Sequence, residues 1–363
     1  MADGPLKIAV DGRELVGKPT GVGRYLLEIL RAWKVSGCPH RVMVITPSAP
    51  APALTADLPD IVWHVEAARG AGTRWEQGRL TRALAKARPD VFFAPAYTAP
   101  LRLPCPMVVV VHDVSFFAHP EWFGRREGWR RRWLTRATAR HARTVVTVSD
   151  FSRGEIERFL KVPAARVVLA PPGAPPHAER AAISREPVLL YVGSLFNRRR
   201  IADLIRAFGL AASRVPGGRL VLVGDNRTSP RIDPVGIAAA AGVADRVEWR
   251  EYETDAARDR LYQSARAFAF LSDYEGFGIP PIEAMAHDVP SVVLDTPVSR
   301  EIYGDAALRV PVDTAAIADA IVSLLTDDGV HARLVDAGRE RLTRFSWAAT
   351  AETVGRALEE AAR

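Results

Sequence analysis

Several features that define other classes of protein are missing from this sequence. Its 363 residues include only two cysteines, Cys38 and Cys105, which are far apart and fit no metal-ligand spacing. Such cysteine usage is typical of a reducing cytoplasm. No apolar run approaches the roughly 18–20 residues that span a bilayer. Residues 1–5 have neither the basic nor the apolar part of a secretory signal. We therefore expect a cytoplasmic location.

Lysine is also scarce, and the charge is uneven. Only 5 of the 49 basic residues are lysine. Basic residues outnumber acidic ones by 26 to 15 in residues 1–178, whereas acidic residues outnumber basic ones by 27 to 23 in residues 179–363. The excess in the first half indicates an anionic partner. The basic stretches form no recognisable nucleic-acid-binding module, so nucleic acid is not expected as that partner.

The length and the order of the apolar runs predict an α/β protein with two domains. A chain of 363 residues is long for one core. Short apolar runs alternate with helical stretches, which predicts parallel sheets with helices on both faces. The clearest break is the Pro/Gly-rich segment that begins at Pro171. We predict Rossmann-like domains at residues 1–178 and 187–345.

The expected elements follow from these runs. The predicted strands are Leu6–Val10, Arg41–Thr46, Val62–Val65, Val91–Ala94, Met107–Val111, Thr144–Val148, Val188–Val192, Arg219–Val223, Val247–Arg250, Ala265–Leu271 and Ser291–Leu294. The main predicted helices are Arg24–Trp33, Thr73–Ala87, Ile201–Arg214 and a last helix that ends at Arg363, with Ser346 as its N-cap. Ser149 is the expected N-cap of the helix after Thr144–Val148.

The most informative stretch is Asp273–Ala286, which follows an expected buried strand. Its two glycines free the backbone to approach a ligand, and its two prolines favour the first turn of a helix. Backbone N–H groups at such a helix start favour an anion. Glu275 precedes the turn, and Glu283 is expected in the first helical turn.

This combination of acids and amides has two interpretations. Carboxylates bind vicinal hydroxyls while N–H groups bind phosphate, and a nucleotide-sugar carries both groups. Alternatively, Glu283 complements the helix dipole and Glu275 is a solvated loop acid. The two glutamates alone do not decide between these interpretations.

Two glycines near the N-terminus mark a second candidate site. Gly21 and Gly23 end a loop between the first strand and the first helix. The loop is not a dinucleotide fingerprint, because its glycine spacing differs, and it is not a Walker A loop, because Pro19 follows Lys18. A plain strand-to-helix turn is the alternative.

Further candidates follow two predicted strands. His112 lies at the carboxyl end of a buried strand, where open α/β sheets bind ligands; a structural histidine is the alternative. Arg198, Arg199 and Arg200 follow Gly193 after the first strand of the second domain. Arginines at that position favour phosphate binding over a solvated surface loop.

Three of these motifs together resemble the retaining glycosyltransferases of family 4, which have the GT-B fold. The matching segments are residues 20–25, 193–201 and 273–286, and the resemblance covers nearly the whole chain. It implies two Rossmann-like domains that face a central cleft, with a C-terminal helix of about residues 346–363 crossing back to the first domain. It also implies transfer of a hexose from a nucleotide-sugar with retention of configuration and without a protein nucleophile.

The resemblance gives the candidate residues their roles. Arg198 and Arg199 would hold the donor diphosphate, with the amides of Phe277, Gly278 and Ile279. Glu275 and His112 would contact the transferred sugar, and Glu283 the ribose. Gly21, Gly23 and Gly193 would face the phosphates, and the strand ends at Gly224 and Tyr252 the base. No Asp-x-Asp occurs in the chain, so we expect no metal and no other cofactor.

The sequence departs from the family pattern at four positions, which leaves the donor open. Phe196 and Asn197 replace an acidic-Pro pair, Asp288 replaces a glycine, and Arg300 replaces a proline. The loop around Gly21 favours GDP-mannose as donor. A nucleotide-sugar epimerase and a non-enzymatic nucleotide-sugar-binding protein are the alternative functions.

A basic segment suggests where the acceptor comes from. Arg125–Arg143 contains eight arginines, with Trp129 and Trp133 four residues apart on a predicted helix. Such a helix can lie on an anionic membrane, or its tryptophans can belong to the core. We expect a glycan or a lipid-linked acceptor, with peripheral contact at the inner face of the membrane.

Overall fold

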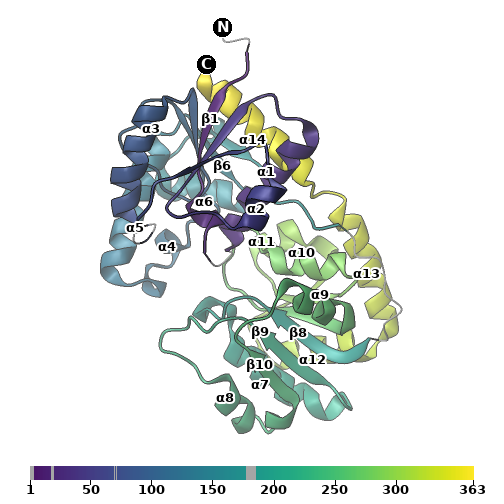
Figure 1. Ribbon diagram of the computed structural model, residues 1–363. Helices are drawn as coiled ribbons and strands as arrows, with labels where there is room; N and C mark the ends of the chain where they lie inside the picture. Colours follow the sequence, from purple (N-terminus) through teal and green to yellow (C-terminus); the bar gives the residue numbers. More distant parts are fainter. Residues whose placement is uncertain (1–3, 18–19, 69, 71, 177–184) are drawn as a thin grey trace. The chain divides into compact units, whose positions relative to one another are not determined.

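The chain divides into two compact units (Figure 1). The computed structural model describes residues 4–17, 20–68, 70, 72–176 and 185–363. Unit 1 comprises Met1–Gly173 and Ser346–Arg363, and unit 2 comprises Ala174–Phe345. Each unit is built on a parallel sheet covered by helices. The predicted α/β fold class is confirmed.

Unit 1 contains a seven-stranded sheet in the order β3-β2-β1-β4-β5-β6-β7. All neighbouring strands are parallel, so the residues after their carboxyl ends share one edge. The strands are β1 (Lys7–Asp11), β2 (Arg41–Thr46), β3 (Val62–Val65), β4 (Val91–Ala94), β5 (Met107–Val110), β6 (Thr144–Thr147) and β7 (Val167–Leu169).

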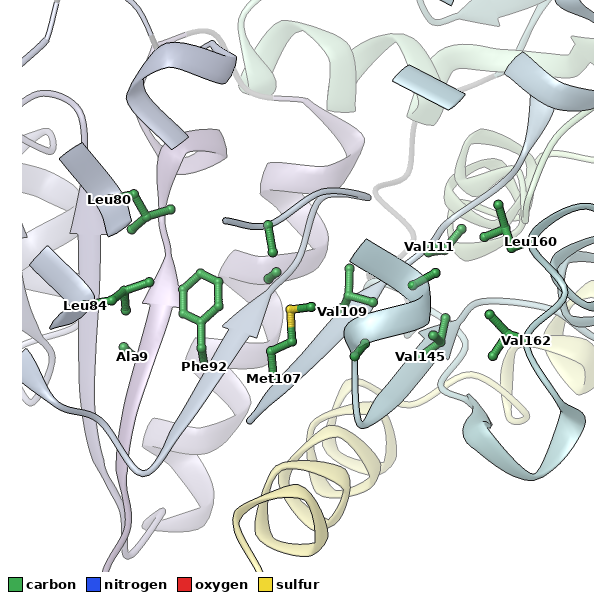
Figure 2. Close-up of a cluster of buried hydrophobic side chains, with 14 of the residues drawn as sticks. Ala9, Leu80, Leu84, Phe92, Met107, Val109, Val111, Val145, Leu160 and Val162 are labelled. Carbon is green, nitrogen blue, oxygen red and sulfur yellow. The ribbon is translucent and has the colours of Figure 1, made fainter. Parts of the chain in front are cut away.

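Helices cover this sheet and enclose its core. Side chains from β1, β4, β5 and β6 form a continuous apolar layer with those of the segment at 80–84, as Figure 2 shows. Phe92 and Val109 are fully buried there, and each such side chain contributes about 1.5–3 kcal/mol. The helices are α1 (Gly21–Ser36), α2 (Pro52–Asp57), the π-helix Trp75–Leu80, α3 (Thr81–Ala87), α4 (Ser115–Ala118), α5 (Arg125–His141), α6 (Asp150–Leu160) and α14 (Trp347–Ala362).

The last helix, α14, packs on α1 (Figure 1). Trp33 Nε1 donates to the carbonyl oxygen of Ala351 at 2.9 Å, and Val354 and Leu358 are fully buried. The hydroxyl of Ser346 accepts from the N–H of Ala349 at 3.4 Å, as expected of an N-cap. Unit 1 is therefore completed by the end of the chain.

Unit 2 contains a six-stranded parallel sheet in the order β10-β9-β8-β11-β12-β13. The strands are β8 (Glu186–Val192), β9 (Arg219–Val223), β10 (Val247–Arg250), β11 (Ala265–Phe270), β12 (Ser291–Leu294) and β13 (Ala307–Val310). The helices are α7 (Ile201–Ala211), α8 (Pro234–Ala240), α9 (Asp255–Ser264), α10 (Ile279–Ala286), α11 (Pro297–Ile302), α12 (Thr314–Thr326) and α13 (Asp328–Leu342).

Some predicted boundaries were wrong. The helix expected from Arg24 begins at Gly21, because the Thr20 hydroxyl caps it by accepting from Gly23 N at 3.0 Å. The bounds of the helix expected over Thr73–Ala87 are confirmed, but its middle part, Trp75–Leu80, is a π-helix. The edge strands β7 and β13 were not predicted. Lys18 and Pro19 lie outside the described residues.

Candidate active site

Two arginines and a carboxylate meet at the carboxyl edge of the unit 2 sheet. Arg198 and Arg199 follow β8, and Glu275 follows β11, the strand paired with β8. Arg199 Nε donates to Glu275 Oε1 at 3.1 Å, and Arg198 Nε lies 3.7 Å from the same oxygen. The Ser272 hydroxyl donates to it at 2.9 Å. The parallel topology thus joins residues that are 76 positions apart.

The charges of this cluster stabilise one another. Burial alone would raise the pKa of Glu275, but Arg199 and Arg198 outweigh burial and the pKa is lowered. Burial likewise opposes the charge of Arg199, whereas Glu275 raises the pKa of that guanidinium. Arg200 is separately paired with Asp273 at 2.6 Å. One carboxylate therefore faces two guanidinium groups, which leaves a net positive charge.

The guanidinium groups are held in fixed orientations. Arg198 lies over the ring of Phe196, with the guanidinium carbon 4.6 Å from the ring centroid, and Arg199 lies over Phe270 at 4.9 Å. The Nε of Arg198 is buried and has no hydrogen-bond partner within the described part of the chain. A buried donor without an acceptor is costly, so an oxyanion placed there would gain this donor.

Two predicted glycines let the strand ends approach one another. A Cβ on Gly193, where φ is +142°, would lie 2.4 Å from Arg199 Nη1. A Cβ on Gly224, where φ is +146°, would lie 2.0 Å from the carbonyl oxygen of Gly193. A side chain at position 193 would displace Arg199, and one at position 224 would push the two strand ends apart. Both glycines therefore shape the arginine turn.

A third glycine forms the turn before α10. Gly278 has φ +84°, and a Cβ added at this position would lie 2.0 Å from the Tyr303 hydroxyl oxygen. That hydroxyl donates to the carbonyl oxygen of Gly278 at 2.9 Å. The ring of Phe277 packs edge-on against Phe345 at 5.2 Å. The turn is therefore fixed from both sides. Helix α10 begins directly after it at Ile279, with Pro280 and Pro281 in the first turn as predicted.

Glu283 lies one turn further along α10 than predicted. The helix begins at Ile279, so Glu283 is its fifth residue and belongs to the second turn. Its side chain is 8% exposed and accepts from the Tyr262 hydroxyl at 3.1 Å. The helix-dipole interpretation of Glu283 loses support, because the dipole acts chiefly on the first turn.

The loop after β10 presents Tyr252 at the same edge of the sheet. Gly224 N donates to the carbonyl oxygen of Arg250 at 2.8 Å, which ties the ends of β9 and β10 together. Tyr252, two residues further on, is 74% exposed. Arg250 Nη1 donates to Glu253 Oε1 at 2.9 Å. An exposed ring beside two tied strand ends is open for a flat ligand to stack on.

His112 occupies the carboxyl edge of the other sheet, in unit 1. Its Nε2 lies 2.9 Å from the carbonyl oxygen of Pro95. A carbonyl only accepts, so Nε2 carries the proton and Nδ1 of the neutral ring is an acceptor. Burial lowers the pKa of His112, which keeps the ring neutral at pH 7. The ring of Tyr25 packs edge-on against it at 5.0 Å.

The two glycines at the start of α1 differ in their surroundings. A Cβ on Gly23 would lie 2.2 Å from the carbonyl oxygen of Glu14, whereas a Cβ on Gly21 would meet nothing within 4 Å. Packing against the preceding loop therefore requires glycine at position 23. The space beside Gly21 leaves that end of the helix accessible.

Neither a metal cluster nor a membrane span occurs within the described ranges. No three His, Cys, Asp or Glu side chains of those residues lie close enough together to hold a metal ion. None of the described helices combines the length and the apolar character that crossing a bilayer requires.

Helix α5 carries the predicted arginine- and tryptophan-rich surface. Trp129 is 65% exposed and Trp133 is 51% exposed, so the alternative in which they form core is wrong. The helix instead packs through Leu134, Thr135 and Ala139. Its outward face therefore combines two large aromatic rings with exposed arginines.

Several supporting residues were not predicted. The rings of Phe196 and Phe270 and the hydroxyls of Ser272, Tyr262 and Tyr303 contact the candidate residues directly. Buried tyrosines have the same apolar spacing in sequence as core residues, so only the fold shows which hydroxyls reach the site.

Comparisons with known proteins show to which proteins this chain is similar. Residues 19–177 match the family described as Glycosyltransferase Family 4, and residues 176–341 match Glycosyl transferases group 1. Together the two models span residues 19–341. The chain is a family 4-like glycosyltransferase. It is 29% identical to the O-antigen chain mannosyltransferase B of Escherichia coli over 74% of each chain. It is 33% identical to a phosphatidyl-myo-inositol mannosyltransferase of Mycobacterium leprae over 34% of each.

Solved structures show the same fold for this glycosyltransferase. HepE of Anabaena, in complex with UDP-glucose, has a TM-score of 0.78 at 18% identity, with 98% of this chain and 100% of that chain covered. WaaG, a glycosyltransferase involved in lipopolysaccharide biosynthesis, has a TM-score of 0.73 at 17% identity, with 97% and 99% covered. The predicted GT-B fold is confirmed, and the family models and named relatives support a transferase.

Proposed function

We propose that this glycosyltransferase moves a hexose from a nucleotide-diphosphate sugar to a glycan or lipid-linked acceptor. The arginine cluster carries the proposal. Arg198 and Arg199 exceed the charge of Glu275, and the Nε–H of Arg198 has no acceptor among the residues that the structure describes. A diphosphate supplies the missing negative charge and oxygen acceptors. HepE, whose structure contains UDP-glucose, has the same fold.

The chemistry assigned to this site is departure of the diphosphate with retention at the sugar. Breaking the glycosidic bond to phosphate places charge on the leaving oxygen. Arg198, Arg199 and the amides around Gly278 would stabilise that charge, and such preoriented donors are worth roughly 10²–10³ in rate each. The acceptor would attack from the face that the diphosphate leaves, and a phosphate oxygen would take its proton. No metal is needed for these steps.

The acidic residues would select the sugar and the nucleoside. Glu283, held by Tyr262, would accept from ribose hydroxyls, and Glu275 from a hydroxyl of the hexose. GDP-mannose is the proposed donor and mannose the transferred sugar, because the relatives include O-antigen and phosphatidyl-myo-inositol mannosyltransferases. Those names also favour a cell-envelope or lipid-linked acceptor.

The site of action would be the inner face of the membrane. The exposed rings of Trp129 and Trp133 on the arginine-rich helix α5 support this part of the proposal. Tryptophan rings settle at the interface of a bilayer while arginines bind anionic headgroups. The enzyme would otherwise be cytoplasmic.

The test begins with a panel of nucleotide-sugars in a thermal-shift assay, followed by NMR of the transferred sugar to read the anomeric configuration. Glu283→Ala should weaken donor binding by roughly 1.5–3 kcal/mol, the scale of a hydrogen bond to a charged group. Unchanged affinity would refute the ribose role. EDTA should leave the rate intact, and strict dependence on added Mn²⁺ or Mg²⁺ would contradict the metal-free mechanism.

A further inference from the structure

A strained turn lies at the carboxyl edge of the unit 1 sheet, after β4. Tyr97 has φ +59°, which is rare for a bulky side chain. The N–H of Thr98 donates to the carbonyl oxygen of Ala96 at 2.5 Å. A three-residue turn with positive φ at its centre is the rarer and more strained form of γ-turn. Such strain persists only where surrounding contacts enforce it.

The turn contacts His112 along much of its length. The carbonyl oxygen of Pro95, at its start, accepts the Nε2–H of His112 at 2.9 Å. The ring of Tyr97 packs against the His112 ring at 5.6 Å, and its hydroxyl donates to Asp113 Oδ2 at 3.1 Å. The backbone of this turn therefore sets both the tautomer and the orientation of His112.

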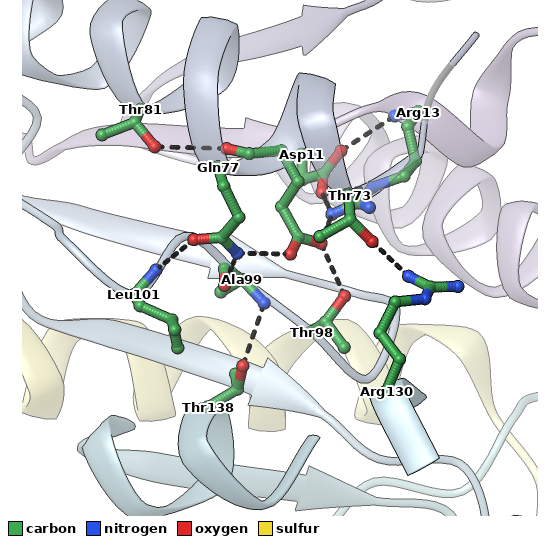
Figure 3. A network of polar contacts seen from close by, with 11 residues as sticks. Asp11, Arg13, Thr73, Gln77, Thr81, Thr98, Ala99, Leu101, Arg130 and Thr138 are labelled. Carbon is green, nitrogen blue, oxygen red and sulfur yellow. Dashed lines mark hydrogen bonds and ion pairs between the residues drawn. The ribbon is translucent and has the colours of Figure 1, made fainter. Parts of the chain in front are cut away.

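Glu76 holds the other side of the turn. The Thr98 hydroxyl donates to Glu76 Oε2 at 2.5 Å, and Arg13 pairs with the same oxygen. Gln77 Nε2 donates to Glu76 Oε1 at 2.7 Å. Figure 3 shows Arg13, Gln77 and Thr98 within this polar network. Glu76 is 1% exposed, and a π-helix is a frequent mark of a functional segment.

The charge of Glu76 makes its carboxylate a strong acceptor for the Thr98 hydroxyl. A hydrogen bond to a carboxylate is roughly twice as strong as one between neutral groups. Arg13 pairs with both Asp11 and Glu76, so a guanidinium group lies against the buried carboxylate. A strained turn needs an acceptor of that strength.

We propose that Glu76 is a positioning residue that, through Thr98, holds the turn at Tyr97 and so fixes His112 with its Nδ1 acceptor ready for substrate. The inference rests on the proposed function and on the role that the family resemblance gives His112, which is contact with the transferred sugar. Turnover would then also depend on the π-helix of unit 1, which carries Glu76.

The test compares two threonines that both donate to Glu76. Thr98→Val removes the bond to the carboxylate, whereas Thr81→Val removes a bond to the backbone carbonyl oxygen of Glu76, 3.2 Å long. Thr98→Val should lower kcat by about 10- to 100-fold, the effect of a small misplacement at a reacting centre. Donor Kd should stay within about twofold in both variants, and Thr81→Val should keep its kcat. Glu76→Gln should reproduce the kcat loss.

Three outcomes would overturn the proposal: a Thr98→Val enzyme with wild-type kcat, equal losses in the two threonine variants, or a kcat loss that follows a fall in melting temperature. The Nε2–H signal of His112 in ¹⁵N NMR, assigned with His112→Asn, gives a readout that needs no activity. Thr98→Val should shift or broaden it and Thr81→Val should not. If the wild-type protein transfers no sugar, the proposed function fails, while this signal still decides whether Glu76 positions His112.

Discussion

Neutralising Glu275 tests the central cluster most directly. In the Glu275→Gln variant two guanidinium groups remain buried without their carboxylate. At 3.1 Å from Arg199, with an effective dielectric constant of about 20, the Coulomb attraction is about 5 kcal/mol before desolvation. Removing one partner of a buried pair costs about 3–5 kcal/mol. Glutamine retains an acceptor for Ser272, so we expect a loss of about 3 kcal/mol.

The pH dependence of this loss has a definite sign. The pKa of Glu275 in the folded protein is lowered from its ordinary value of 4.5. The carboxylate therefore contributes its full stability above about pH 4.5, and the contribution disappears as the pH falls through the lowered pKa. Wild type and Glu275→Gln should differ at pH 7 and converge toward pH 3.

Thermal unfolding followed by circular dichroism measures this difference. For a unit of this size about 3 kcal/mol corresponds to a decrease of roughly 6–12 °C in the melting temperature. Glu248→Gln is the matched control, because its carboxylate is 43% exposed and exposed pairs contribute about 0–1 kcal/mol. Equal stability of Glu275→Gln and wild type at pH 7 would refute the reasoning, as would a difference that persists unchanged at pH 3.

Other consequences of the structure can be measured in the same way. Arg198→Ala should lower kcat by about 10²–10³ and donor affinity much less; a loss confined to Kd in isothermal titration would make Arg198 an anchor only. Because the pKa of His112 is lowered from 6.5 by burial, kcat/KM should stay level from pH 8 to below pH 6.5 and fall only as the ring is protonated; a decline that begins above pH 6.5 would contradict the neutral ring. Replacing Trp129 and Trp133 by Ala should at least halve sedimentation with phosphatidylglycerol vesicles, relative to Val35→Ala on α1; equal sedimentation would remove α5 as the contact.

The sequence alone predicted the strands well where they are central. The runs at Val91–Ala94 and Arg219–Val223 coincide with β4 and β9, because strands buried on both faces are uninterrupted apolar segments. The edge strand Ala307–Val310 was missed, since it is short and half-polar. The π-helix at Trp75–Leu80 has the composition of an ordinary helix.

The candidate site could be predicted only in part from the sequence. Glycines at positions 193, 224 and 278 were predicted, and all three have positive φ. The pairing of Arg199 with Glu275 depends on the adjacency of β8 and β11, which residue spacing does not contain. Glu76 was not predicted, because an acid within a helical stretch is normally a solvated residue.

The docking of α14 on α1 affects the order in which a nascent chain can mature. Residues of unit 2 are contiguous and leave the ribosome before the last helix does. The indole of Trp33 obtains its acceptor, Ala351, only when that helix emerges. Unit 2 can thus complete its core during synthesis, whereas the side chains of α1 that pack against α14 stay uncovered until that helix has emerged.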